Sequence, residues 1–158
     1  MIKEISKEDL YECADVIKES FSSVAEEFNI TEQNVPRYVA FSTTGKKLSE
    51  QYDNGRKMFA YFNGCKIVGF YSLEFDGNEC ELNNLCVLPD YRHKGIGDKL
   101  IEHSFNTAQK NNCTKMNISI VEENQLLKKW YIDYGFVPLY TKKYDFFPFT
   151  CGYMRKEL

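Results

Sequence analysis

The residues with the clearest capacity for chemistry lie in one segment near the middle of the chain. An apolar stretch ending in Val87-Leu88-Pro89 runs into a basic turn, Arg92-His93-Lys94-Gly95-Ile96-Gly97, and then into an amphipathic helical pattern. Such a turn directs unpaired backbone N–H groups and the positive end of the helix dipole at one point, beside the cationic side chains. The segment therefore predicts a site for a ligand that carries phosphate.

Two common phosphate-binding loops fit this turn poorly. A P-loop ends in Gly-Lys-Ser/Thr, whereas here Lys94 precedes Gly95, and Asp98 follows Gly97. A dinucleotide-binding fingerprint needs a third glycine in an early βαβ unit, and the chain has neither.

The turn resembles the Arg/Gln-x-x-Gly-x-Gly/Ala signature of the GNAT superfamily of N-acetyltransferases. A second, independent stretch is similar to the Asn…Tyr-x-x-x-Gly-Phe pattern of the same family, with Asn124, Tyr131, Gly135 and Phe136 at its positions. Leu127 departs from the pattern, since many members have a small residue there. These motifs cover only about residues 81–136, and the first fifty-odd residues match in the order of elements alone.

The resemblance implies acetyl-CoA as co-substrate and no metal. In the family the pantetheine lies between two splayed strands, here 80–87 and 117–121, where a backbone N–H polarises the thioester carbonyl. The residues expected to bind the co-substrate are Leu85, Cys86, Val87, Arg92, His93, Lys94, Gly95, Ile96, Gly97, Asp98, Asn124 and Tyr131. The charges of Arg92, Lys94 and Lys99 are expected to balance the phosphates.

Two residues are expected to move protons. A primary amine with a pKa near 10 is almost entirely protonated at neutral pH, so a base must deprotonate it. By resemblance Glu81 is that base and Tyr131 is the general acid for the thiolate. The alternatives are a solvent-facing Glu81, with a water chain as the base, and a Tyr131 that is only a core aromatic. An acyl-cysteine at Cys86 is disfavoured, because no histidine adjoins it in the strand.

The acceptor side is expected at residues 28–41 and 140–152. Polar contacts are predicted from Thr31, Glu32 and Asn34, and an aromatic wall from the segment that contains Phe149. A carboxylate such as Glu32 would suit a cationic amine. The aromatic residues could equally form hydrophobic core or the surface of a homodimer.

Composition limits the class of protein. The 158 residues predict one domain, 1–158, and the net charge of −3 argues against a nucleic-acid partner. The six cysteines form no metal-ligating or disulfide grouping, so we expect reduced thiols and a cytoplasmic protein. The first residues are too charged for a signal peptide, and no apolar run approaches a membrane span.

The pattern of apolar residues predicts a mixed α/β fold in the order β-α-α-β-β-β-α-β-α-β-β, as in the GNAT fold. Helices are predicted over 6–23, 36–41, 96–112 and 124–134, with 46–54 a helix or a loop. Strands are predicted over 2–5, 58–62, 66–75, 80–87, 115–121, 136–144 and 151–156.

The predicted function is N-acetyl transfer from acetyl-CoA to a primary amine of a small molecule, by direct transfer in a ternary complex. Three alternatives stay open: a protein or peptide N-acetyltransferase, a non-catalytic acyl-CoA sensor of the same fold, and an interaction module that does not bind CoA.

Overall fold

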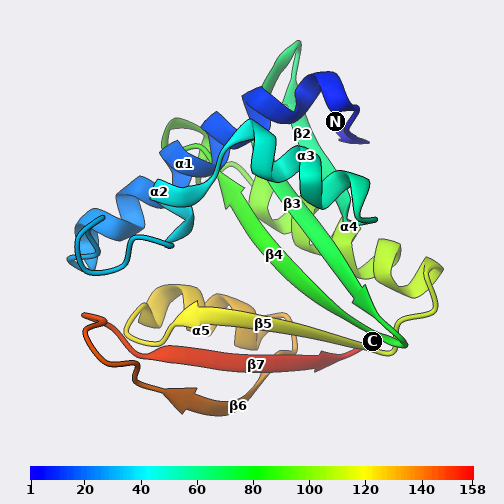
Figure 1. The fold of residues 1–158 in the computed structure, drawn as a ribbon. Coiled ribbons are helices and arrows are strands. Elements are labelled where there is room, and N and C mark those ends of the chain that lie inside the picture. The colour runs from blue at the N-terminus through cyan, green and yellow to red at the C-terminus, as the bar shows by residue number, and fades with distance from the viewer.

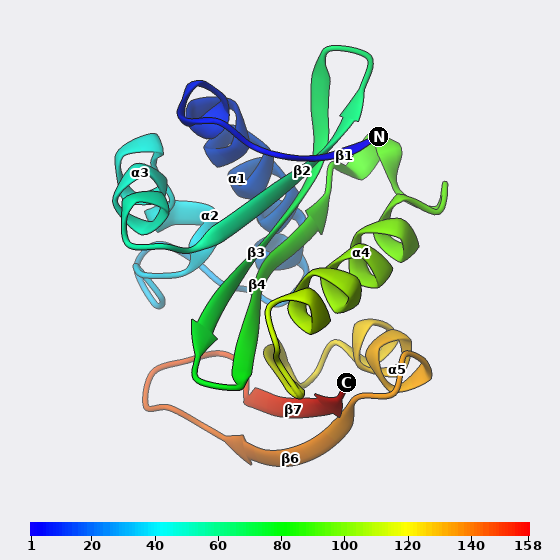
Figure 2. The same cartoon turned by 90° about the vertical axis from the view of Figure 1, so that its right-hand side faces the viewer.

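A computed structural model describes residues 1–158 and consists of one seven-stranded mixed sheet with helices on both faces (Figures 1 and 2). The strands are β1 (Ile2–Glu4), β2 (Lys57–Asn63), β3 (Lys66–Asp76), β4 (Glu79–Val87), β5 (Lys115–Val121), β6 (Val137–Lys142) and β7 (Cys151–Glu157). The helices are α1 (Leu10–Glu27), α2 (Val39–Ser42), α3 (Gly45–Asp53), α4 (Ile96–Lys110) and α5 (Gln125–Asp133), with short 3-10 turns at Lys7–Asp9 and Pro89–Tyr91.

The sheet is divided by one parallel pair in its middle. The strand order is β1-β2-β3-β4-β5-β7-β6, and every neighbouring pair except β4 and β5 is antiparallel. β4 and β5 pair only over Glu79–Glu81 and Lys115–Asn117 and then diverge (Figure 1). The two halves of the sheet therefore form a V that opens toward the carboxyl ends of both strands.

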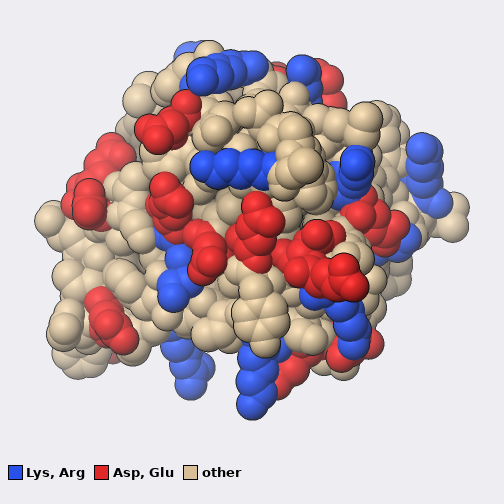
Figure 3. All heavy atoms as spheres, turned by 90° about the horizontal axis from the view of Figure 1, so that it is seen from above, with Lys and Arg blue, Asp and Glu red and all other residues tan.

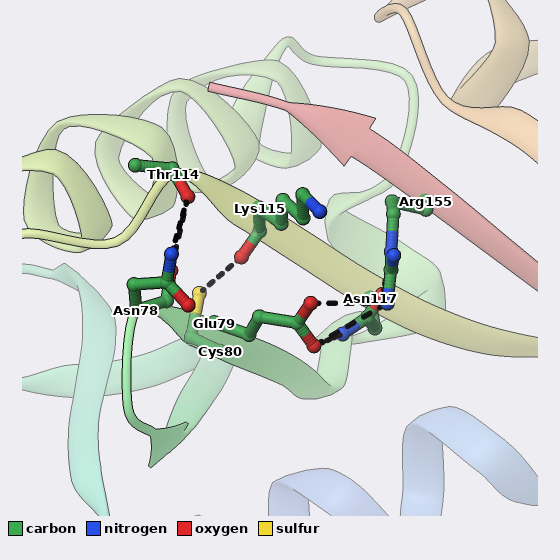
Figure 4. Close-up of polar contacts among 7 residues, drawn as sticks. All are labelled: Asn78, Glu79, Cys80, Thr114, Lys115, Asn117 and Arg155. Atoms are coloured by element: carbon green, nitrogen blue, oxygen red, sulfur yellow. Dashed lines mark hydrogen bonds and ion pairs between the residues drawn. The ribbon is translucent and has the colours of Figure 1, made fainter.

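A polar network holds the closed end of this V (Figure 4). Arg155 of β7 donates from Nε to Asn117 Oδ1 at 2.7 Å and lies 3.3 Å from the Glu79 carboxylate, to which Asn117 also donates. Asn78 donates to Thr114 Oγ1 at 3.2 Å, just before the two strands begin to pair. These contacts join β4, β5 and β7 where the strands meet, so the divergence beyond them starts from a fixed point.

A β-bulge bends β4 at the place where it leaves β5. Phe70 of β3 pairs with Cys86 and Ser72 pairs with Asn83, so two residues of β4, Asn84 and Leu85, lie opposite one residue of β3. Asn84 has a φ of 57°, a left-handed conformation that asparagine tolerates better than most residues. Such a bulge increases twist and ends regular pairing.

The helices bury apolar stripes on the two sides of the sheet. α1, α2 and α3 lie on one face of the β2–β4 half, and α4 lies on the other (Figure 2). Leu10, Ala14 and Ile17 of α1 are buried, as are Leu100 and Ile101 of α4. Burial of these apolar side chains holds both helices against the sheet.

Several predicted boundaries are wrong, for local reasons. α1 continues to Glu27 because Ser22 and Ser23 return their hydroxyls to the carbonyls of Lys18 and Ser20 instead of ending the helix. The helix predicted over 36–41 is the single turn α2, and residues 45–53 form the helix α3, capped by Thr44, whose Oγ1 accepts from Lys47 N. β6 is shorter than the predicted strand 136–144.

Charge and hydropathy add two observations. On the face of the molecule drawn in Figure 3, Lys and Arg side chains are interspersed with Asp and Glu, so this face presents no continuous basic surface. No helix combines the length and the apolar composition that crossing a bilayer requires.

Candidate active site

A cavity of about 370 Å³ fills the opening of the V. β4 contributes one wall and β5 the other, while α1, the segment before α2, α5 and the segment before β7 close the remaining sides. The lining residues are Phe21, Val24, Val35, Arg37, Tyr38, Val39, Leu82–Leu85, Ile118–Val121, Asn124, Leu127, Tyr131, Phe147, Phe149 and Cys151. Most of them are apolar, and none carries a carboxylate.

Tyr131 of α5 lines this cavity. Its side chain is 6% exposed and packs edge-on against Trp130 and Phe136, with ring centroids 5.0 and 5.3 Å away. Burial, and secondarily the nearby Cys86 thiol, raises the pKa of the Tyr131 phenol above its ordinary value. The hydroxyl is therefore protonated at neutral pH and available as a donor inside the cleft.

Asn124 and Leu127 lie on the same side of the cavity as Tyr131. The Asn124 Oδ1 accepts a hydrogen bond from Leu127 N at 3.3 Å, which caps the first turn of α5. Asn124 therefore has the capping role that its position in the sequence suggests, while its side chain also faces the cavity. Gly135 follows the helix at a φ of 96°, in the left-handed conformation predicted for it.

The turn from Arg92 to Gly97 has the form of an anion site. His93 and Gly95 both have positive φ, 61° and 80°, and Gly95 is the residue that begins α4. The N–H groups of His93, Lys94 and Gly95 donate no hydrogen bond within the protein, and the first N–H groups of a helix have no intrahelical acceptor. Consecutive backbone donors at this turn therefore have no acceptor within the protein, which is the arrangement that an anion site requires.

The Arg92 side chain is hydrogen-bonded within the protein. Its guanidinium donates to Val87 O at 3.0 Å, to Ser23 Oγ at 3.0 Å and to Ser20 O at 2.8 Å. These bonds tie the end of β4 to α1 and engage much of the guanidinium within the protein. The expected part of this side chain in balancing phosphate charge stays a prediction.

Three lysines supply positive charge near the turn. The ammonium groups of Lys66 and Lys94 lie over the ring of Tyr91, 5.4 and 5.3 Å from its centroid, and Lys99 lies over Tyr61. None of these lysines forms an ion pair. Lys66 was not predicted from the sequence, because only the hairpin brings it beside the turn.

Asp98 connects the turn to α5. Its carboxylate accepts from Trp130 Nε1 at 3.2 Å and from the Tyr134 hydroxyl at 2.5 Å. The aspartate, predicted to bind the co-substrate, thus also fixes the helix that carries Tyr131 relative to the turn. Ile96 is mostly buried beneath the turn, and Gly97 lies against Trp130.

Glu81 lies at the edge of the cleft rather than in it. It occupies the last residue pair of β4 and β5, opposite Asn117, and is absent from the cavity wall that begins at Leu82. Partial burial and the Glu74 carboxylate raise its pKa, and Arg56, which pairs with Glu74 at 2.8 Å, lowers it. The Glu81 carboxylate therefore lies next to the cavity wall and does not form part of it.

Leu85 is part of the bulge of β4, and Cys86 and Val87 follow it. Leu85 lines the cavity. Cys86 is 8% exposed, and burial raises the pKa of its thiol to about 12, so it is not a thiolate at neutral pH.

Of the four residues predicted to contact the acceptor, only one lines the cleft. Phe149 lines the cavity. Thr31 and Asn34 instead hydrogen-bond to each other's backbone N–H groups, at 2.8 and 3.2 Å, and Glu32 is exposed outside the cavity. The spacing Thr-x-x-Asn is the signal that could have identified this self-contained turn.

Residues that the sequence did not single out also line the cleft. They include Phe21, Arg37, Tyr38 and Asn83. Because α1 extends beyond its predicted end, it reaches the mouth of the V together with the segment before α2.

The cleft and the turn together fit a long ligand with phosphates at one end. The unpartnered strand edges beyond Glu81 and Asn117 suit an extended arm with amide groups, and the free N–H groups of the turn suit phosphate oxygens.

Comparisons with known proteins identify the domain type. Residues 54–138, more than half of the chain, match the family model described as acetyltransferase (GNAT) domain. The solved PaiA N-acetyltransferase from Thermoplasma acidophilum, in complex with coenzyme A, has a TM-score of 0.83 at 21% identity, over 100% of this chain and 98% of that one. The ribosomal-protein-alanine N-acetyltransferase from Brucella melitensis has a TM-score of 0.74 at 17% identity, over 100% and 99%. A GNAT family acetyltransferase from Elizabethkingia anophelis with acetyl-CoA bound has a TM-score of 0.63 at 22% identity, over 72% and 83%.

Proposed function

The chain belongs to the GNAT acetyltransferases, enzymes that use acetyl-CoA, and on that premise we propose that it acetylates a primary amine of a small molecule by direct transfer. The observation that carries this proposal is the buried Tyr131 hydroxyl in the cavity between β4 and β5. A cavity of about 370 Å³, closed over by residues before α2 and before β7, suits a small acceptor.

We assign co-substrate binding to the cleft and the turn. When bound there, acetyl-CoA supplies an activated acetyl group. The turn N–H groups of His93 to Asp98 hold phosphate oxygens, and Lys66, Lys94 and Lys99 add charge at that end. A backbone N–H of the Leu85–Val87 segment donates to the thioester carbonyl, where negative charge develops. Tyr131 donates its proton to the sulfur that leaves.

Direct transfer is favoured over an acyl-cysteine. The Cys86 thiol has a pKa of about 12 and is buried in a strand. A nucleophilic cysteine needs an accessible thiolate and an adjacent base. Initial rates measured with both substrates varied should therefore give intersecting lines, and parallel lines would contradict direct transfer.

Glu81 accepts the amine proton through water in this proposal, and its pKa makes the role testable. The rate at low pH should rise as the Glu81 carboxyl loses its proton. Arg56→Gln removes the cation that lowers this pKa, so the acidic limb of kcat/KM should move to higher pH. Glu74→Gln removes the anion that raises it and frees Arg56, so the limb should move to lower pH.

The measurement is kcat/KM against pH for the wild type and these two variants, with an acceptor alkylamine that carries no charged group besides its amine. Glu81→Gln should abolish the limb. A Glu81→Gln enzyme that keeps the wild-type profile would show that a water chain without this carboxylate removes the proton.

The proposed function is tested by ligand-dependent melting followed by an amine panel. Acetyl-CoA at about a hundred times its dissociation constant should stabilise the fold by about 2.7 kcal/mol. Free thiol and acetylated amine should then appear in equal amounts with at least one small primary amine. Stabilisation without turnover on any amine or peptide would indicate an acyl-CoA sensor.

One observation favours a second acceptor class. The similar structures include a ribosomal-protein-alanine N-acetyltransferase, and β6 is an exposed edge strand of the sheet, whose free backbone edge could pair with a peptide. Peptides with free N-termini therefore belong in the same panel. Faster acetylation of a peptide than of every small amine would replace the small-molecule proposal.

A further inference from the structure

A second, polar cavity of about 150 Å³ adjoins the cleft on the β4 side. Its walls come from the segment before α2, from α2 and α3, and from β4. The lining residues are Arg37, Val39, Ser42, Thr43, Lys47, Leu48, Gln51, Arg56, Asn83 and Asn84. Arg37, Val39, Asn83 and Asn84 line both cavities, so the two spaces meet at the bulge of β4.

All charged side chains that line this second cavity are cationic. Arg37, Lys47 and Arg56 line it, and no aspartate or glutamate lines either cavity. Arg56 is neutralised by Glu74 at 2.8 Å, whereas Arg37 and Lys47 form no ion pair. The only polar side-chain contact of the Lys47 ammonium is Ser42 Oγ at 3.4 Å. Cations that share a small cavity without an anion create a positive potential at its centre.

Unpartnered polar atoms at the same place point to a ligand. The Nδ2 group of Asn83 is buried and donates no hydrogen bond, although Asn83 lines both cavities. The Oε1 atom of Gln51 is also buried and accepts none. A buried polar group without a partner costs free energy that a ligand can recover. The Asn83 donor fits an anionic oxygen, and the Gln51 oxygen fits a hydroxyl or amide N–H beside it.

We propose that the acceptor amine carries an anionic group, a carboxylate or a phosphate, which Arg37, Lys47 and Asn83 bind in the second cavity. This inference rests on the proposed N-acetyl transfer and specifies its substrate class. The amine end of the acceptor lies in the main cleft near Tyr131, and its anionic end reaches across the β4 bulge. Diamines and polyamines are disfavoured, because nothing in either cavity pairs with a second cation.

The proposal differs from the sequence-based expectation that a carboxylate such as Glu32 pairs with a cationic acceptor. Glu32 is exposed and lines neither cavity, while Thr31 and Asn34 satisfy each other within their turn. We therefore assign recognition of the acceptor to Arg37 and Lys47, the unpaired cations of the second cavity.

The experiment compares straight-chain primary amines of matched length that end in a methyl group, a carboxylate, a phosphate or a second amine. The measured quantity is kcat/KM from thiol release with acetyl-CoA. At the best chain length, an anionic member should exceed the methyl and diamine members by roughly tenfold or more, the effect of one or two charge-assisted hydrogen bonds. Comparison of the carboxylate and phosphate arms identifies the anion.

Charge variants test where the anion binds. Arg37→Gln and Lys47→Gln should each lower the ratio of kcat/KM for the anionic amine to kcat/KM for the methyl-terminated amine by roughly tenfold. Arg37→Glu should reverse the preference toward the diamine. Lys46→Gln is the matched control, because Lys46 is exposed on α3 and lines neither cavity. Melting with acetyl-CoA confirms that each variant is folded.

Two results would overturn the inference separately from the proposed function. Acetylation of methyl-terminated amines or diamines at least as fast as anionic amines would remove the anion site but keep the N-acetyl transfer. An equal fall in kcat/KM for all amines in Arg37→Gln would also remove the anion site and keep the N-acetyl transfer. If acetyl-CoA binds and no amine is acetylated, the proposed function fails and this inference fails with it.

Discussion

Replacing Tyr131 with phenylalanine is expected to lower kcat by roughly a hundredfold or more while leaving acetyl-CoA affinity within about twofold, because general-acid groups contribute on the order of 10²–10⁴ to rate. The phenol is buried in the cleft, and burial keeps it protonated. Phenylalanine retains the ring that packs on Trp130 and Phe136. The change therefore removes the proton donor and little of the packing.

The measurement is kcat under saturating substrates together with the dissociation constant of acetyl-CoA by calorimetry. Tyr140→Phe is the matched control, because Tyr140 is 60% exposed on β6 and lies outside the cavity. A Tyr131→Phe enzyme with wild-type kcat would remove Tyr131 from the chemistry and leave it a packing residue.

The second large effect is expected at the bulge. Asn84→Val places a β-branched residue at a φ of 57°, a conformation that such residues rarely adopt. The strain costs about 1–3 kcal/mol. Relaxation of β4 to regular pairing would relieve it and narrow the V. We expect lower stability and an acetyl-CoA dissociation constant raised roughly tenfold.

Asn84→Gly is the paired variant, since glycine adopts positive φ without strain. It should keep the bulge and bind acetyl-CoA nearly as the wild type does. Urea denaturation and calorimetry on both variants give the two quantities. Equal, wild-type affinity in Asn84→Val and Asn84→Gly would show that the bulge does not hold the cleft open.

Local sequence signals predicted the parts of the site that depend on neighbouring residues. The turn 92–97 has left-handed residues at His93 and Gly95 and leads into a helix, and Gly95 is the local signal for both features. The roles of Asn124, which caps α5, and of Gly135, which follows that helix, also depend only on neighbouring residues. For this reason the turn that precedes α4 and the helix that carries Tyr131 were predicted at their actual positions.

The parts that depend on long-range packing were not predictable in this way. The bulge at Asn84 is set by the register of β4 on β3, which no residue pattern in β4 reveals. The contacts of the Arg92 side chain depend on α1, which lies beside it and accepts two of its hydrogen bonds. The sequence around Arg92 does not reveal these contacts. The second cavity joins residues of α2, α3 and β4, which are far apart in the sequence.

Hydrogen–deuterium exchange with and without acetyl-CoA tests the central claim most directly, namely that the ligand lies between β4 and β5. Backbone groups on the facing edges beyond Glu81 and Asn117 have no strand partner, so their amides should exchange quickly in the free protein. Acetyl-CoA should protect peptides that cover 82–87, 92–98 and 118–121, and leave β1 and β2 unchanged. Protection confined to segments outside the V, with none in 82–87 or 118–121, would contradict this account of the site.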